Sequence, residues 1–162
     1  MAVLKIHTNP DPVLRTKAKK VTRLDGYIQK LIDDMIETMD KSNGVGLAAN
    51  QVGIPLRIVV IRMPEDKDPL VLINPEVVEK RGERRVVEGC LSIPGYQAEI
   101  TRAYSVKVRA RDRHGKLIRK RATDNLLANC MEHEIDHLNG VLYIDYLSSV
   151  DELIKVNSGS EE

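Results

Sequence analysis

Aromatic side chains are scarce in this sequence, which has no tryptophan, no phenylalanine and only five tyrosines among its 162 residues. Proteins hold single-stranded nucleic acids largely by stacking bases on such rings, so a stacking platform is excluded. The 25 basic and 24 acidic residues leave a formal net charge of +1, and no overall field attracts nucleic acid or an anionic membrane. We therefore expect neither a nucleic-acid substrate nor a membrane partner.

Cysteine is also scarce, and the chain lacks any long hydrophobic run. Cys90 and Cys130 are too few for a disulfide framework and are typical of free thiols or of a metal ligand. No stretch approaches the length of a membrane span, and Pro10 and Pro12 interrupt the N-terminal segment where the apolar core of a signal peptide would lie. The sequence favours a reducing compartment, and we expect a cytoplasmic protein.

The overall composition is that of one folded domain. Hydrophobic residues make up 42% of the chain and charged residues 30%, which differs from the composition of disordered proteins. A chain of this length buries enough apolar surface to form a core around a functional site. We expect a single domain over residues 1–150, followed by a polar tail over residues 151–162 that frays.

The spacing of apolar residues predicts two helices and several strands. The first helix ends before Gly44, and its buried stripe consists of Ile28, Leu31, Ile32, Met35, Ile36 and Met39. Strands are expected over residues 57–63, 70–74, 84–87, 105–110, 116–122 and 141–147. The second helix begins with Thr123 or Asp124 as its N-cap and stops at Asn139 and Gly140.

A segment of small residues follows the first helix. Residues 44–51 read GVGLAANQ, in which two glycines and two alanines remove side-chain bulk from the backbone. We therefore expect residues 44–51 to form a loop that lets a ligand or another chain approach closely. It is also compatible with a plain connection between a helix and a strand.

The most specific motif lies on the second predicted helix, where residues 133–137 read HEIDH. Residues four apart on a helix lie one above the other, so His133 and His137 can reach a single metal ion. Glu134 occupies a different helical position and is placed to accept a proton from a metal-activated water. A solvated helix face that carries two histidines is the alternative interpretation.

A third ligand must come from elsewhere, because catalytic zinc-type sites use three protein ligands and leave one position for water. Neither His7 nor His114 has ligand-like surroundings. Cys90 is the better candidate, since it lies in residues 88–92 (EGCLS), where the preceding glycine allows a sharp turn. A lone cysteine is otherwise a small buried hydrophobic residue.

Three segments together resemble the signature motifs of one family, the peptide deformylases. These segments are residues 44–51, 88–92 and 133–137, which occur in the order and at the spacing of that family. The resemblance extends from the N-terminal segment to about residue 147. It implies a metal-dependent hydrolase that removes the formyl group from the N-terminal methionine of new proteins and releases formate.

The resemblance also implies roles for individual residues. Cys90, His133 and His137 resemble the metal ligands, and Glu134 resembles the catalytic acid and base. The implied fold is α+β, with mostly antiparallel strands packed around a central helix that bears the metal-binding motif. One thiolate and two imidazoles do not select among iron, zinc, nickel and cobalt, and the family implies one Fe(II) per chain.

Further roles concern the substrate. The side-chain amide of Gln51 and the backbone N–H of Leu91 resemble the donors that stabilise the developing oxyanion. Gly44, Val45 and Gly46 resemble the segment that pairs with the substrate backbone. The expected partners are N-formylmethionyl nascent peptides and, by the same resemblance, the ribosome near its exit tunnel.

The second cysteine is expected to serve the substrate pocket. Cys130 and His137 are seven residues apart, which corresponds to a rise of about 10 Å along a helix. Ligand bonds of roughly 2.0 to 2.3 Å do not span such a separation. Cys130 is therefore predicted to pack as a small apolar residue near the methionine pocket.

A few positions depart from the family pattern or have an open interpretation. Glu132 and Asn129 replace a glutamine and an apolar residue that are common in relatives, and Gln97 replaces an arginine of some relatives. Glu88 and Arg102 resemble a pair that holds the cysteine loop, although a bare pair of this kind is equally typical of a surface salt bridge.

Two other functions share part of this pattern. A zinc metallopeptidase uses the same His-Glu-x-x-His motif and the same activation of water, but Cys90 and Gln51 argue against it. A non-catalytic protein that binds nascent chains or ribosomes is the second alternative, and the complete set of ligands and base argues against that.

Overall fold

The computed structural model describes residues 2–156, which form two α-helices, four short 3-10 helices and eight strands. The α-helices are α1 (Gly26–Lys41) and α2 (Leu126–Leu138). The strands are β1 (Gly46–Ala48), β2 (Ile58–Ile61), β3 (Leu70–Arg81), β4 (Arg84–Cys90), β5 (Ile93–Arg102), β6 (Ser105–Arg111), β7 (Leu117–Thr123) and β8 (Ile154–Lys155). The 3-10 helices are η1 (Pro12–Arg15), η2 (Ala49–Val52), η3 (Tyr143–Tyr146) and η4 (Val150–Glu152).

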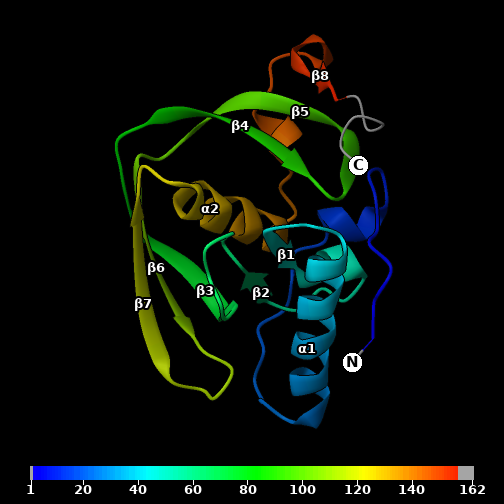
Figure 1. The fold of residues 1–162 in the computed structure, drawn as a ribbon, viewed down its shortest axis with the longest axis vertical. Helices are drawn as coiled ribbons and strands as arrows, with labels where there is room; N and C mark the ends of the chain where they lie inside the picture. Colours follow the sequence, from blue (N-terminus) through cyan, green and yellow to red (C-terminus); the bar gives the residue numbers. More distant parts are fainter. Residues whose placement is uncertain (1, 157–162) are drawn as a thin grey trace.

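The strands form two sheets, and the helix α2 lies between them (Figure 1). One sheet has the order β1-β2-β3-β6-β7 and the other the order β4-β5-β8. Every ladder between these strands is antiparallel. The predicted α+β fold, with mostly antiparallel strands around a central helix that bears the histidine motif, is confirmed.

The larger sheet is covered on both faces where β2 crosses it. Val59 and Ile61 pack with α2, whereas Ile58 and Val60 pack with α1 on the opposite face. Because both faces are buried, β2 is a continuous apolar run rather than an alternating one. The apolar cluster around α1 contains no residue of β6 or β7, and α1 contacts that hairpin at its turn, where Arg113 bonds to Gln29 and Asp33.

The two α-helices begin at side-chain caps. The Asp25 carboxylate accepts the backbone N–H of Ile28 at the start of α1. The Asn125 side chain accepts the backbone N–H of Ala128 at the start of α2. The predicted N-cap at Thr123 or Asp124 is therefore wrong by one or two residues, since an asparagine caps as well as an aspartate. The predicted stop is correct, with Asn139 as the C-cap.

Three segments differ from the predicted secondary structure. Residues 44–51 are not wholly a loop, because β1 pairs with β2. Strand β5 was not predicted, since Pro94 and Gly95 near its start are typical of a turn. Residues 141–147 do not form a strand but contain η3, whose first turn is held by the Asp145 carboxylate accepting the Leu142 N–H at 3.0 Å.

The end of the described chain lies against the smaller sheet. Residues 154 and 155 form β8 within the segment predicted as a polar tail, and β8 pairs with Tyr96 and Gln97 of β5. The remainder of that predicted tail, residues 157–162, lies outside the described residues. Within residues 2–156, no helix combines the length and the apolar character needed to cross a membrane.

Candidate active site

Three predicted ligands meet between α2 and the end of β4. The ligand atoms of Cys90, His133 and His137 all lie within 4.8 Å of one another. The Nε2 atoms of the two histidines are 3.2 Å apart, and the Cys90 Sγ lies 3.3 Å from His137 Nε2. The sequence placed both histidines on one helix, and the fold brings the cysteine to them from a separate strand.

The spacing of these atoms fits a metal ion. Two nitrogen ligands at metal distances of about 2.0 to 2.1 Å in tetrahedral geometry are roughly 3.3 Å apart, and a sulfur at about 2.3 Å is slightly farther from each. Both histidines are buried, and both direct Nε2 to the same point as the thiol. One sulfur and two nitrogen atoms supply three of the four tetrahedral positions, and the fourth is left for water or substrate.

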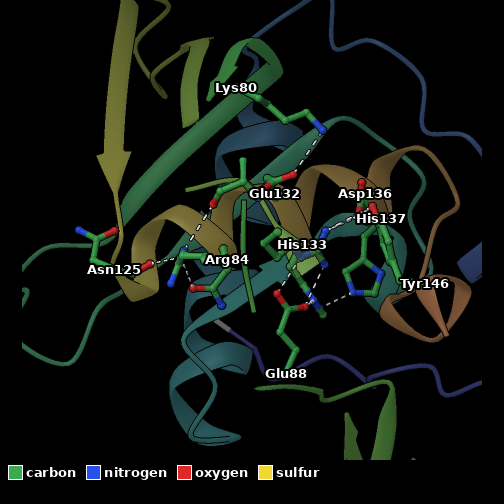
Figure 2. A network of polar contacts seen from close by, with 12 residues as sticks. Lys80, Arg84, Glu88, Asn125, Glu132, His133, Asp136, His137 and Tyr146 are labelled. Carbon is green, nitrogen blue, oxygen red and sulfur yellow. Dashed lines mark hydrogen bonds and ion pairs between the residues drawn. The ribbon is translucent and has the colours of Figure 1, made fainter. Parts of the chain in front are cut away.

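The buried Glu88 fixes the orientation of His133. Its Oε1 lies 2.7 Å from the His133 Nδ1, so Nδ1 carries the hydrogen and Nε2 stays free for a metal (Figure 2). Burial raises the pKa of Glu88, but the hydrogen bonds of Arg102 and His133 outweigh burial and lower the pKa to about 2. Glu88 is therefore ionised at neutral pH, despite an exposure of only 5%.

Arg102 neutralises this buried carboxylate and links it to the end of α2. Its Nε and Nη2 donate to the two oxygens of Glu88 at 2.8 and 2.9 Å, and its Nη1 donates to Asp136 Oδ2 at 2.7 Å. The Tyr146 hydroxyl donates to the same Asp136 oxygen, and its ring lies 4.9 Å from the Arg102 guanidinium. Glu88 and Arg102 are thus not a surface salt bridge but part of a buried network behind the histidines.

Glu134 is buried beside the ligand triad, with 4% of its surface exposed. Its Oε1 has no hydrogen-bond partner within the described residues. Burial raises the pKa of this carboxyl to about 7. A carboxyl that exchanges protons near neutral pH suits general acid and base catalysis.

The side chain of Gln51 is locked toward Cys90. Its Oε1 accepts the backbone N–H of Ala48 at 2.9 Å, which leaves the amide N–H groups on the opposite side. The Nε2 donates to the Ser92 hydroxyl at 3.1 Å and contacts the Cys90 sulfur at 3.6 Å. The backbone N–H of Leu91, next to Cys90, makes no hydrogen bond within residues 2–156.

An open cleft leads to these groups. Gly44, Val45 and Gly46 line it on one side, and it extends past Cys90 and Glu134. Residues of β4, β5 and the start of α2 complete the lining, among them Val87, Pro94, Tyr96, Gln97 and Leu126. Nine of the ten predicted site residues therefore line this cleft, and the tenth, His137, is buried beside it as part of the ligand triad.

Cys130 faces this cleft but is not among the ligand atoms. It is 5% exposed and belongs to the apolar cluster around α2. Burial raises the pKa of its thiol well above the ordinary value, so the sulfur is protonated. A protonated, apolar-packed cysteine is a poor metal ligand.

The departures from the family pattern have structural partners. Glu132 accepts the backbone N–H of Ala103 at 2.8 Å and lies 3.4 Å from the Lys80 ammonium, so its charge is compensated (Figure 2). The Asn129 oxygen accepts a hydrogen bond from Arg84, and Gln97 pairs with Gly89 at the cleft.

Sequence reasoning missed several supporting residues. Ser92, Asp136 and Tyr146 orient Gln51 and Arg102, and Tyr96 lines the cleft from the unpredicted β5. Ser92 lies within residues 88–92 and Asp136 within residues 133–137, so their positions in these two motifs could have indicated a supporting role. Nothing in the spacing of Tyr96 or Tyr146 pointed to the site.

Comparisons with known proteins agree with this arrangement. The polypeptide deformylase family matches residues 3–152 of the chain. The peptide deformylase of Dehalococcoides mccartyi strain CBDB1 is 55% identical over 161 residues, which are 99% of this chain and 96% of that protein. The peptide deformylase of Bartonella henselae is 54% identical over 87% of this chain and 82% of its own length.

Solved structures show the same fold. A peptide deformylase from Legionella pneumophila superposes with a TM-score of 0.90 at 45% identity, covering 93% of this chain and 89% of that one. A peptide deformylase from Synechococcus elongatus, solved in complex with actinonin, has a TM-score of 0.87 at 43% identity, covering 92% and 81%. With the family match over nearly its whole length, the chain belongs to the polypeptide deformylases, metal-dependent hydrolases that remove the N-formyl group from N-formylmethionyl peptides.

Proposed function

We propose that Cys90, His133 and His137 hold one divalent metal ion and that Glu134 is the catalytic acid and base. When bound, the ion supplies a water of lowered pKa and polarises the formyl oxygen. The observation that carries the proposal is the buried Glu134 carboxylate, whose Oε1 has no protein partner within the described residues, beside three converging ligand atoms.

Glu134 moves the protons of the reaction. A carboxyl with a pKa of about 7 accepts a proton from the attacking water and returns it to the leaving amine at neutral pH. Formate and a free methionyl terminus are the products. Gln51 Nε2 and the Leu91 N–H donate to the formyl oxygen as its negative charge develops, and each such donor contributes on the order of a hundredfold in rate.

The substrate backbone is proposed to bind between two sheet edges. The strand β1 is one edge of the larger sheet, and β4 is one edge of the smaller sheet. An extended peptide can add to an unpaired edge through main-chain hydrogen bonds, and these bonds do not depend on the side chains of the peptide. Gly44, Val45 and Gly46 present the first edge, and Cys130 lines the pocket for the methionine side chain.

The metal is proposed to be Fe(II), with zinc, nickel and cobalt as alternatives. The mixed thiolate and imidazole set accepts all four ions. Elemental analysis of protein purified without oxygen tests the assignment. A stoichiometric content of zinc with no iron would contradict it.

The other proposals concern the cellular setting and the domain division. We propose that the enzyme acts in the cytoplasm on chains emerging from the ribosome, because its substrates are the first residues of new proteins. The catalytic domain is taken as residues 1–150, with residues 151–162 as a polar C-terminal tail. Activity after removal of that tail tests the division.

The decisive experiment replaces Glu134 with glutamine, which keeps the size of the side chain and removes its proton transfer. We expect Glu134→Gln to keep its metal and to lose about a hundredfold or more of kcat on a formylmethionyl peptide. An assay on an unformylated peptide with internal amide bonds runs beside it, since a metallopeptidase would cleave that peptide. Full activity of Glu134→Gln would remove Glu134 from the mechanism.

A further inference from the structure

The positive charge of this nearly neutral chain is concentrated in one hairpin. Between residues 105 and 123, which form β6, β7 and their turn, lie eight of the chain's 25 basic residues and one of its 24 acidic residues. The formal net charge of the whole chain is +1, so the remainder of the chain is acidic. A local field at this hairpin is therefore much stronger than the net charge suggests.

The register of β6 and β7 aligns these charges on one face. Val106, Val108 and Ala110 of β6 are buried against the α2 side, so the alternating residues point away from the core. Lys107 pairs with Arg121 and Arg109 pairs with Arg119 across the two strands, and the next outward residue of β6 is Arg111. Like charges placed directly opposite each other destabilise a sheet, so this arrangement does not serve stability.

Most of these cations have no acidic partner. Among residues 2–156, Arg109 and Arg121 pair with Glu76 and Glu79 of β3. No carboxylate of the described chain lies within 4.0 Å of the remaining three, which are Lys107, Arg111 and Arg119. The helix α1 contacts this hairpin at its turn, where Arg113 pairs with Asp33, and its apolar cluster includes no residue of β6 or β7. Arg111 and Arg119 on the strands remain exposed.

A groove continues this face toward the N-terminal segment. Its lining includes five basic residues, Lys17, Lys20, Arg57, Arg109 and Arg111, and one acidic residue, Glu76, which pairs with Arg109. Within residues 2–156, the Arg57 guanidinium donates only to neutral oxygens, which are Ala18 O at 3.3 Å and Leu138 O and Asn139 Oδ1, both at 3.0 Å. An arginine fixed in place without a counter-ion is ready to bind an anionic oxygen.

We propose that this basic face binds the phosphate backbone of double-stranded RNA. The face is defined as the outward side chains of β6 and β7 together with the groove residues Lys17, Lys20 and Arg57. No tryptophan, phenylalanine or tyrosine lies between residues 105 and 123, so the face offers no platform of large rings for unstacked single-stranded bases. Rows of arginine and lysine instead suit the regularly spaced phosphates of a duplex, with no dependence on base sequence.

RNA fits this face better than a lipid surface does. Membrane-binding surfaces pair their cations with apolar or aromatic side chains that enter the bilayer. Among the outward residues of β6 and β7, only Leu117 is a large apolar side chain. The RNA is a docking partner and not a substrate, and the inference does not depend on the catalytic roles proposed above.

The basic face leaves the catalytic cleft accessible. The groove and the cleft share no lining residue. The sheet that carries the basic face lies on one side of α2, whereas β4 and β5 complete the cleft on the other side (Figure 1). A chain docked on RNA through β6 and β7 therefore keeps its peptide-binding side free.

The test compares two variants that lose the same charge. The triple variant Lys107→Gln, Arg111→Gln and Arg119→Gln removes the cations without acidic partners. The matched control is Lys5→Gln, Lys41→Gln and Lys67→Gln, three exposed lysines outside the face. Binding of the full chain to a short RNA duplex is measured over a range of salt from about 0.05 M upward.

We expect the hairpin variant to raise the dissociation constant about tenfold or more and to lower the slope of log K against log salt by about three. The control should change the dissociation constant less than about twofold, and both variants should deformylate a short formylmethionyl peptide like the unmodified chain. Lost deformylation by the unmodified chain with intact RNA binding would refute only the proposed function.

Three results would overturn the proposal. The first is no binding of the unmodified chain to the RNA duplex at low salt. The second is an equal loss in the control variant, which would reduce the effect to net charge. The third is tighter binding to phosphatidylserine-containing vesicles than to RNA at the same salt, which would make the face a membrane surface.

Discussion

Gly46 of β1 lies directly against Glu134 of α2. A Cβ atom at position 46 would be 2.7 Å from Glu134 Oε2 and 2.8 Å from the Cys130 sulfur, closer than nonbonded atoms approach. A side chain at position 46 would therefore have to displace the Glu134 carboxylate and the Cys130 sulfur. The substrate-binding edge and the proposed base are in this way parts of one packed unit.

This contact predicts the effect of a single methyl group. Gly46→Ala should displace the Glu134 carboxylate and lower kcat by about tenfold to a hundredfold, because small misplacements of a catalytic group are costly. Metal content should remain unchanged. The control is Gly26→Ala at the start of α1, where a Cβ would meet nothing within 4 Å, and steady-state kinetics of both variants provide the measurement. Equal kinetics of the two variants would contradict the positioning argument.

The two cysteines are predicted to behave differently. Cys90→Ala removes a ligand atom of the triad and should lose tight metal binding and turnover together. Cys130→Ala removes a protonated, apolar-packed thiol and should keep stoichiometric metal and most activity. Metal analysis and deformylation rates of both proteins, prepared without oxygen, decide the matter. Loss of metal from Cys130→Ala alone would reverse the assignment.

Removing the buried charge behind His133 should affect both metal binding and stability. Glu88→Gln removes the ionised acceptor of His133 Nδ1, and the metal affinity should fall by about tenfold to a hundredfold. It also leaves Arg102 partly uncompensated, so the free energy of unfolding should fall by about 3 kcal/mol. Metal titration and denaturant unfolding measure the two effects.

A matched change at an exposed site provides the control for this prediction. Glu99 lies on β5 and forms an exposed ion pair with Arg85. Exposed pairs contribute little, so Glu99→Gln should leave metal affinity unchanged and stability within about 1 kcal/mol. A comparable effect of both substitutions would show that Glu88 acts only as one more surface charge.

Asn129 should tune the choice of substrate side chain. Arg84 Nη2 donates to its Oδ1 at 3.0 Å, and because arginine has only donors, the amide oxygen faces Arg84 and the NH₂ group lies elsewhere. Asn129 lines the cleft, so its NH₂ group is a donor available to the substrate. A formyl peptide whose first side chain carries an acceptor, such as methionine sulfoxide, should benefit from it.

The variant Asn129→Leu tests this donor. It should lower kcat/KM for formyl-methionine sulfoxide peptides relative to formyl-norleucyl peptides by about tenfold, the effect of one lost hydrogen bond at a desolvated site. The norleucyl substrate serves as the internal control, because it has the same length and no acceptor. An unchanged ratio would show that the amide does not reach the side chain.

Local sequence was sufficient for the chemistry that lies on one helix. The spacing of His133 and His137 follows from the helical repeat, and Glu134 is set between them by the same geometry. The prediction of α2 needed only the apolar stripe and the stop at Asn139. These features depend on contacts within a few residues, so the sequence alone determined them.

Other features depend on residues far apart in the chain. Cys90 reaches the histidines only because β4 packs over α2, and Glu88 becomes ionised and buried only because Arg102 arrives from β5. The prediction missed β5, since Pro94 and Gly95 are typical of a turn; they lie in an irregularity of the ladder, and the strand is established by the pairing of residues 97–102 with β4. Tertiary structure also determined the conformation of residues 141–147. Their apolar run is compatible with a strand or a helix, and the hydrogen bond of Asp145 in the first turn stabilises a 3-10 helix instead.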